Sequence, residues 1–222
     1  PYDVKHSLKA NYYYMLPFGK GKRWEGNRYT NAVFGGWAIA GIWSYQSGSP
    51  YTILSGWGTL NRAGRSTNTN TATVNGATWS QLEPLTSGVF MTGSGPYFIS
   101  PKIINTDGRG AAQAGNAPYS GEMFFNPTAG TVGNLQRRMF SGPWAWQWDA
   151  SMIKSIRFKE RHSIDLHFDI TNFMNHPTFY VPPTSGDYGT TTGFSVNGTT
   201  FGKITSMNYA PRRIQIGAYY RF

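Results

Sequence analysis

The chain contains no cysteine, few acidic residues and no long apolar run. Its 222 residues include 20 Lys and Arg but only 10 Asp and Glu. Without cysteine there is no disulfide framework, no thiolate nucleophile and no Cys-ligated metal centre. No window of 18 apolar residues occurs, so the sequence predicts no transmembrane helix.

Charge is scarce as well as unbalanced. Charged residues make up 14% of the chain, against roughly 25% in a typical soluble domain. The formal net charge of +10 raises nucleic-acid binding as a hypothesis. A nucleic-acid site would place basic residues on one face with stacking aromatics, whereas here they are spread along the chain. We therefore expect no nucleic-acid partner, and we expect the basic loop residues to lie beside lipopolysaccharide (Arg62, Arg65, Lys102, Arg109, Arg137 and Arg138).

Apolar and polar residues alternate along five runs, with almost no helical periodicity. This pattern predicts an all-β fold. Four of the runs alternate for 10 or more residues, longer than the 5 or 6 typical of strands in soluble sandwiches. The expected strands are Lys5–Leu16, Val33–Gln46, Trp144–Phe158, His162–Phe173 and Arg213–Phe222.

Two long polar connections separate these runs. About 95 residues lie between Ser47 and Pro143, far beyond ordinary loop length, and a second connection covers Met174–Tyr209. Within the first we expect short strands at Tyr51–Leu54, Ala72–Trp79 and Val89–Met91, and a loop tip at Ser66–Thr73. The division into segments is therefore 1–47, 48–143 and 144–222, with the last containing the loop 174–209.

Aromatic residues gather near the ends of the apolar faces. An aromatic girdle at each membrane interface produces this distribution, and membrane β-strands need about 9 to 11 residues. A soluble β-sandwich with core aromatics is the alternative, but the polar faces suit a wet lumen (Lys5, Lys9, Asp165, His167, Asp169 and Arg213). The expected girdle residues are Tyr12, Tyr14, Trp37, Trp43, Trp144, Trp146 and Trp148.

The C-terminal residues form the most specific pattern. Gln215, Gly217, Tyr220 and Phe222 match a polar residue, a glycine and two aromatics at fixed spacing. This pattern resembles the assembly signal read by the machinery that inserts outer-membrane barrels.

With these motifs placed, the chain resembles the C-terminal part of TonB-dependent outer-membrane receptors, in particular the Oar-like group with a carboxypeptidase-regulatory-like domain. The resemblance covers both ends of the chain, while Leu54–Ile104 matches no motif of the family. The matching residues are Asp3 with His6, Leu16-Pro17-Phe18-Gly19-Lys20-Gly21, Gly35-Gly36-Trp37 through Gly41-Ile42, Gln46-Ser47-Gly48, Pro50-Tyr51-Thr52, Phe125-Asn126-Pro127, Gly133-Asn134, Asp149 with Ser151 and Lys154, Phe173 with Asn175-His176-Pro177, Phe201-Gly202, and Pro211-Arg212 with Gln215.

The resemblance implies an antiparallel transmembrane β-barrel segment within a larger barrel of 22 strands. Five strands cannot close a barrel, so we expect upstream barrel strands and a plug, in the same or a separate chain, and through them a TonB-type energy coupler. If Phe222 ends at the periplasmic rim, the turn at Lys159–Arg161 and the connection Pro17–Ala32 are periplasmic. The two long connections then face the cell exterior.

The expected function is ligand binding at extracellular loops of the bacterial outer membrane, followed by energised uptake. Loop aromatics could stack on a sugar or peptide, namely Trp57, Trp79, Tyr97 and Phe98. A surface-exposed structural or adhesive β protein and a soluble lectin-like sandwich are the alternatives.

We expect no enzyme activity, no cofactor and no metal site. Asp165 and Asp169 are about 13 Å apart if they lie in one strand, too far for a glycosidase pair. His162 and His167 are five residues apart and would face opposite sides of a strand. The basic stretch Lys20–Arg23 lacks the spacing and the hydroxyl of a phosphate-binding loop.

Overall fold

The structure is a computed structural model that describes residues 4–60, 70–159, 162–179, 194–205, 207 and 210–222. The described residues form two compact units. The sheet unit comprises those of 7–46, 146–178 and 209–222, and the loop unit comprises those of 1–6, 47–145 and 179–208. None of the described helices is long and apolar enough to cross a membrane.

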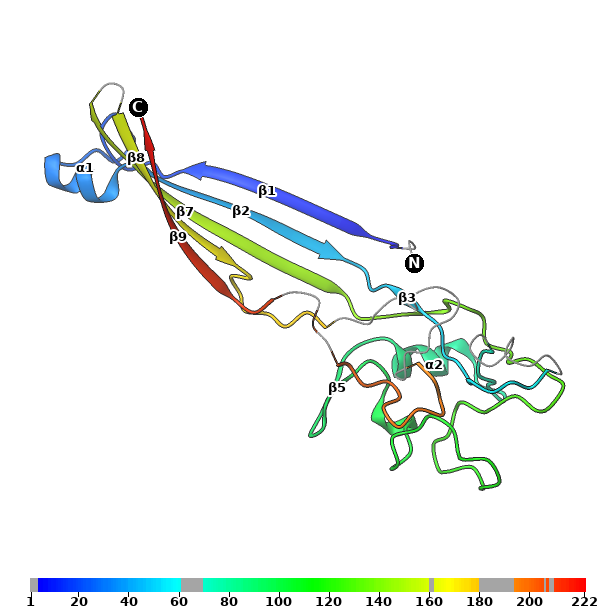
Figure 1. Cartoon of the computed structure of the whole chain (residues 1–222). Coiled ribbons are helices and arrows are strands. Elements are labelled where there is room, and N and C mark those ends of the chain that lie inside the picture. The colour runs from blue at the N-terminus through cyan, green and yellow to red at the C-terminus, as the bar shows by residue number, and fades with distance from the viewer. Residues whose placement is uncertain (1–3, 61–69, 160–161, 180–193, 206, 208–209) are drawn as a thin grey trace. The chain divides into compact units, whose positions relative to one another are not determined.

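Five long strands form the main sheet, in the order β1-β2-β7-β8-β9 (Figure 1). Neighbours pair antiparallel at β1–β2, β7–β8 and β8–β9. The prediction of five long alternating strands is therefore confirmed, although among the described residues these strands form an open sheet and not a closed barrel. The strands are β1 (Ser7–Met15), β2 (Trp37–Gln46), β7 (Ala145–Lys159), β8 (His162–Thr171) and β9 (Arg213–Arg221).

The start of the second expected strand is wrong. Residues 28–34 form helix α1 (Arg28–Phe34), and β2 begins only at Trp37. The side chain of Asn27 caps this helix, since its Oδ1 accepts hydrogen bonds from the backbone N–H groups of Tyr29 and Thr30. After the helix, Gly36 has a φ of 71°, a left-handed conformation that favours glycine and turns the chain into β2.

The loop unit has its own hydrophobic core, made mainly of aromatic and β-branched side chains. Residues from the second long connection complete it, because the backbone of Leu54 pairs with Phe194 and Val196. The long connection is thus a folded element. The most deeply buried members of this core are Tyr51, Ile53, Phe98, Ile99, Phe124, Phe140, Phe194, Val196 and Phe201.

Short elements surround this core. β3 (Pro50–Tyr51) pairs with β6 (Phe140–Ser141), and β4 (Phe90–Thr92) pairs with β5 (Gly95–Tyr97). Helix α2 (Trp79–Thr86) and the 3-10 turn η1 (Pro101–Ile103) are the helical elements of the described loop unit. The predicted strand at Val89–Met91 agrees with β4 to within one residue.

Two expectations within the long connection are wrong. Ala72–Trp79 is not a strand: Thr71 and Thr73 form only isolated bridges, and Trp79 opens α2 after the capping box of Thr78 and Gln81. The stretch 66–73 is not a loop tip at its described end, because Asn70, Thr71 and Ala72 are buried. Residues 66–69 lie outside the described residues.

The strand expected at Tyr51–Leu54 is shorter, with β3 ending at Tyr51 and Leu54 forming isolated bridges.

Candidate functional site

The register places the apolar residues of the five strands on one continuous face of the sheet. Leu8, Ala10, Tyr12 and Tyr14 of β1 lie opposite Tyr45, Trp43, Gly41 and Ile39 of β2. Met152 and Ile156 of β7 lie opposite Phe168 and Ile164 of β8, which lie opposite Ile216 and Tyr220 of β9. The two halves share this face, because the Trp37 ring lies 6.3 Å from that of Phe168.

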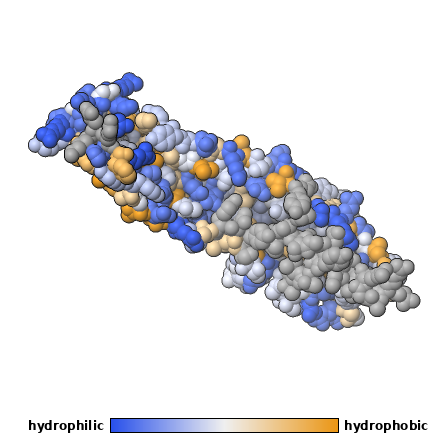
Figure 2. Space-filling view, turned by 45° about the horizontal axis from the view of Figure 1, so that its top comes forward, coloured by the Kyte–Doolittle hydropathy of each residue, from blue (hydrophilic) through white to orange (hydrophobic). Residues whose placement is uncertain are grey.

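Many side chains on this face are exposed in the sheet. Leu8 is 55% exposed, Ile214 66% and Ile216 70%. Figure 2 shows hydrophobic residues gathered over the end of the sheet that carries α1. Monomeric soluble proteins rarely expose so large an apolar surface, so this face requires a non-aqueous environment or a covering partner.

Three of the seven expected girdle residues, Trp43, Trp146 and Trp148, lie toward the ends of β2 and β7 that are away from α1. Trp43 stacks with Tyr45 at 5.8 Å, Trp146 lies 4.2 Å from the ring of His176, and Trp148 lies 5.2 Å from Phe173. Trp144 precedes β7 and stacks on His6, 6.1 Å away, in the loop unit.

The other three girdle residues are placed differently. Trp37 lies at the α1 end of β2, and Tyr14 is next to the last residue of β1. Tyr12 is not at a strand end: it lies opposite Gly41, the middle of β2, and its hydroxyl accepts a hydrogen bond from the Trp148 indole at 3.1 Å.

An aromatic cluster at the α1 end of the sheet joins Phe158 and His162, which the sequence reasoning missed, to Tyr220 of the C-terminal motif. Phe158, His162 and Tyr220 lie 5.8 to 6.3 Å apart, and Nδ1 of His162 is 2.5 Å from the Tyr220 hydroxyl oxygen. Phe222 extends the cluster and lies 6.0 Å from Tyr220. The alternation of β7 and β9 could have indicated it, since these residues end the apolar faces.

The opposite face of the sheet carries the carboxylates of the strands, which are bonded to neighbouring groups, together with some apolar side chains such as Ile42 and Met15. Asp165 is buried and pairs with Arg221 at 2.7 Å, while Asp169 accepts a hydrogen bond from the Ser151 hydroxyl. Asp149 accepts from Gln147 at 2.6 Å and from the backbone of Asn172 at 2.8 Å. The two carboxylates Asp165 and Asp169 therefore have separate partners.

The C-terminal motif lies in β9 and just beyond it. Gln215 pairs with Asp169, Gly217 with His167 and Tyr220 with Ile164. Phe222 follows the strand and is 92% exposed. The motif is thus presented on an outer strand of the sheet, and its role in assembly stays a prediction.

The four loop aromatics expected to bind a ligand have different environments. Trp57 is 37% exposed and Trp79 is 42% exposed, with Trp79 stacked on Phe140 at 5.8 Å. Tyr97 is half-buried in β5. Phe98 is only 2% exposed, lying 4.9 Å from Tyr51 and 5.3 Å from Phe194, so its assignment to a ligand surface is wrong and it belongs to the core.

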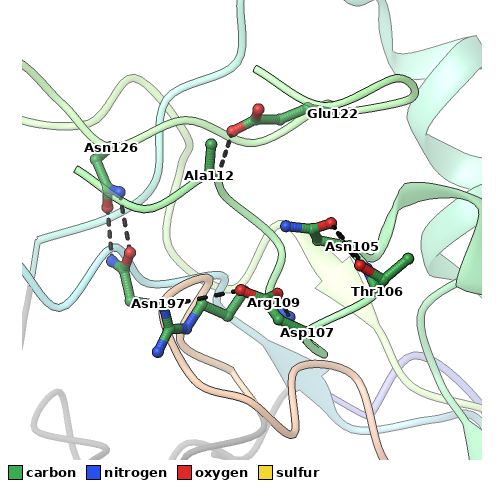
Figure 3. Close-up of polar contacts among 8 residues, drawn as sticks. All are labelled: Asn105, Thr106, Asp107, Arg109, Ala112, Glu122, Asn126 and Asn197. Carbon is green, nitrogen blue, oxygen red and sulfur yellow. Dashed lines mark hydrogen bonds and ion pairs between the residues drawn. The ribbon is translucent and has the colours of Figure 1, made fainter. Parts of the chain in front are cut away.

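A polar network joins three distant segments of the loop unit. Asn126 and Asn197 exchange two side-chain hydrogen bonds of 3.0 and 2.7 Å, and Figure 3 shows their amides pointing toward one another. The Ser55 hydroxyl donates to Asn126 at 3.0 Å, and the Asn197 amide donates to the Ser55 carbonyl. This network fixes the position of the second long connection against the first.

The buried phenol of Tyr51 and the half-buried phenol of Tyr119 join segments of the loop unit. Burial raises the pKa of Tyr51 well above its ordinary value, and the protonated hydroxyl donates to the Thr86 carbonyl at 2.5 Å. Burial also raises the pKa of Tyr119, with the carboxylates of Glu122 and Asp107 adding to the effect. Its hydroxyl lies 2.8 Å from the carbonyl oxygen of Ile103 and 3.1 Å from that of Gly110. Among the described residues no group of three His, Asp or Glu side chains is placed to hold a metal ion.

A comparison with family models identifies residues 1–215 as an outer membrane beta barrel domain. The chain belongs to this family. No curated protein and no solved structure matches the chain. Membership assigns the chain to the outer membrane and confirms the expected β-barrel class.

This family assignment identifies the environment of each face of the sheet. In outer-membrane β-barrels the apolar side chains of each strand meet lipid, and the polar side chains line the interior. The exposed apolar face of the sheet is therefore the lipid-facing side, which explains why it is not covered by protein. The polar face with Asp149, Asp165 and Asp169 faces the barrel interior, and its ion pair and hydrogen bonds satisfy groups that would be costly to leave unpaired.

Proposed function

We propose that the chain forms one sector of a TonB-dependent outer-membrane receptor that binds a ligand at its outer loops and imports it. The observation that carries the proposal is the contrast between the two ends of the sheet. At one end only two residues separate the end of β7 from the start of β8, whereas at the other end β2 and β7 are joined through the folded loop unit. Outer-membrane barrels have short periplasmic turns and long extracellular loops.

In the proposed topology, the end of the sheet that carries α1 faces the periplasm. Figure 1 shows α1, the start of β8 and the C-terminus at this same end. The loop unit then lies on the cell exterior, beside lipopolysaccharide. Further strands cover the outer edges of β1 and β9, and a plug contacts the energy coupler. Upstream sequence, in the same or a separate chain, supplies both the strands and the plug.

The proposed ligand is a sugar or a peptide. Trp57 and Trp79 present partly exposed rings on the loop unit, as such ligands require for stacking, and Tyr97 adds a half-buried phenol. Phe98 is not part of this proposal, because its ring is buried. The rigid core beneath these residues would hold the surface in place, which lowers the entropy lost on binding. We propose no catalytic step for this surface.

The experiment compares surface binding with uptake. Cells carrying the complete receptor are offered fluorescein-labelled oligosaccharides and oligopeptides, with and without the TonB-type coupling protein. We expect one probe class to bind in both strains and to accumulate inside only when the coupler is present. Replacing Trp57 and Trp79 by Ala should reduce binding about tenfold, while the matched exposed variant Met91→Ala should bind normally.

An adhesive role is the alternative outcome of this experiment. The loop unit has its own core, so it could act as an attachment module without transport. Binding that never leads to accumulation, in either strain, would contradict the receptor proposal and favour adhesion.

A further inference from the structure

The connection between β1 and β2 carries further exposed apolar surface of the sheet unit. It contains an isolated bridge between Phe18 and Trp24 and then helix α1. This connection lies at the end of the lipid-facing side of the sheet, and the function proposed above makes no use of it.

Two side chains of the lipid-facing side hold the C-terminal end of α1. The ammonium of Lys154 donates to the carbonyl oxygens of Ala32 at 2.7 Å and Val33 at 3.0 Å, and also to that of Gly35. The Trp37 indole donates to the same Val33 carbonyl at 2.8 Å. Lys154 is 7% exposed and lies over the Trp37 ring at 5.3 Å. The helix is thereby fixed to the lipid-facing side where the sheet ends.

The helix nevertheless leaves its large side chains uncovered. Tyr29 is 81% exposed and Val33 60% exposed, and their spacing of four residues places them on the same side of the helix. Phe34 is 60% exposed and Trp24, just before the helix, is 54% exposed. Aromatic and aliphatic side chains in this position suit the boundary between headgroups and acyl chains.

Basic residues surround these apolar side chains. Lys20, Lys22, Arg23 and Arg28 are all exposed, and Arg23 lies 5.7 Å from the Trp24 ring. The acidic residue of this stretch, Glu25, accepts a hydrogen bond from the backbone of Gly21 at 3.0 Å. The segment thus combines an excess of positive charge with exposed apolar groups, and it continues the lipid-facing side of the sheet.

We infer that residues 18–34 form a binding surface for anionic phospholipid headgroups. Helix α1 lies in the membrane interface, with Tyr29 and Val33 toward the acyl chains and the basic residues on the phosphates. Lys154 and Trp37 hold the helix at that depth. The assignment to the periplasmic leaflet rests on the topology proposed above, whereas binding to the bilayer surface rests only on the position of α1 at the end of the sheet.

Because the chain contains no cysteine, one introduced cysteine can carry a fluorophore at a single chosen position. Val33→Cys carries a nitrobenzoxadiazole fluorophore in protein reconstituted into phosphatidylcholine vesicles with about 30 mol% phosphatidylglycerol. Ile216→Cys on the lipid-facing side is the positive control, and Met91→Cys in the loop unit, 70% exposed, is the negative control.

Depth is measured with lipids that carry a spin label near the headgroup or deep in the chain. We expect the fluorophore at position 33 to be quenched about twofold more strongly by the shallow label, and the one at position 91 not to be quenched. If neither spin label quenches the fluorophore at position 33 while position 216 is quenched, this inference is wrong. The conclusion that the sheet spans the membrane would still hold. Loss of quenching at position 216 would instead contradict the membrane-spanning sheet and the proposed function with it.

Headgroup preference is measured with spin-labelled phosphatidylglycerol against spin-labelled phosphatidylcholine. We expect quenching at position 33 to be at least about twofold stronger with the anionic lipid, and this preference to vanish in the Lys20→Gln, Lys22→Gln, Arg23→Gln variant. Lys102→Gln, in the loop unit, is the matched charge control and should keep the preference. Equal quenching by the two headgroups in the unmutated chain would overturn the inference.

Discussion

Gly41 leaves room for the Tyr12 side chain, which packs over it in the middle of the sheet. A Cβ atom at this position would lie 2.5 Å from the Asp149 carbonyl oxygen and 2.6 Å from the Tyr12 hydroxyl oxygen. Both distances are shorter than side chains tolerate, and the Tyr12 hydroxyl is bonded to Trp148. The glycine therefore permits both close packing of β2 on β7 and the Tyr12–Trp148 hydrogen bond.

We expect Gly41→Ala to destabilise the complete refolded receptor by about 1–3 kcal/mol, because overpacking forces the Tyr12 ring and the strand backbone to move. Urea unfolding in lipid vesicles, followed by tryptophan fluorescence, measures the change. Gly93→Ala in the loop unit is the control, since a Cβ atom there would have no described atom within 4 Å. Equal stability of the two variants would show that Gly41 is not required for packing.

Single residues differ in how well the sequence predicts their role. The alternation of Ile164, Phe168 and Ile216 follows from a period of two, and the structure places all three on one face. Whether a loop aromatic is exposed depends on what packs over it. Phe98 and Trp79 looked equivalent in the sequence, but only Phe98 is covered by Tyr51 and Phe194.

Helix α1 is held in place by residues of β2 and β7. It has seven residues, too few to be stable by itself, and its hydrogen bonds to the sheet come from Lys154 and Trp37. The helix therefore depends on a lysine more than one hundred residues away in β7.

We expect Lys154→Met to release α1, because the carbonyls of Ala32, Val33 and Gly35 lose their charged donor. Hydrogen exchange of the Asn31 and Gly35 amides, which close the helix, should accelerate about tenfold or more. Lys22→Met, an exposed lysine in the same connection, should leave this exchange unchanged. Unaltered protection in Lys154→Met would mean that Trp37 and the Asn27 cap suffice.

The same reasoning explains which elements the sequence could predict. A strand of ten residues shows its period several times, so the five long strands could be recognised with errors of a few residues at the ends. Helices α1 and α2 span seven and eight residues, about two turns, and give no clear helical period. Val33 and Trp79 also favour strands by residue type, which led to the wrong assignments there.

At the scale of the whole chain, the pairing of the two long connections could not be predicted. Leu54 bonds to Phe194 and Val196, and Asn126 to Asn197, across separations that leave no pattern in the sequence. The first connection supplies most of the core, and Phe194, Val196 and Phe201 of the second complete it. The polar composition of the two connections is typical of loops, so it did not indicate that they share a hydrophobic core.

The open edges of the sheet lead to the last prediction. Among the described residues, β1 and β9 each pair with one neighbour. About half of the backbone amides of such an edge strand point away from the sheet, and leaving them unpaired in lipid costs several kcal/mol each. We therefore predict that both edges are paired with further strands in the outer membrane.

We expect the amides of β9 in native outer membranes to exchange with deuterium as slowly as those of β8, which has a partner on both sides. The same chain, refolded alone in detergent micelles, provides the comparison. There, alternate amides of β9 should exchange at least about tenfold faster than those of β8, because water reaches the free edge. Fast exchange of alternate β9 amides in the native membrane would contradict a larger barrel, because it would show that no strand covers this edge.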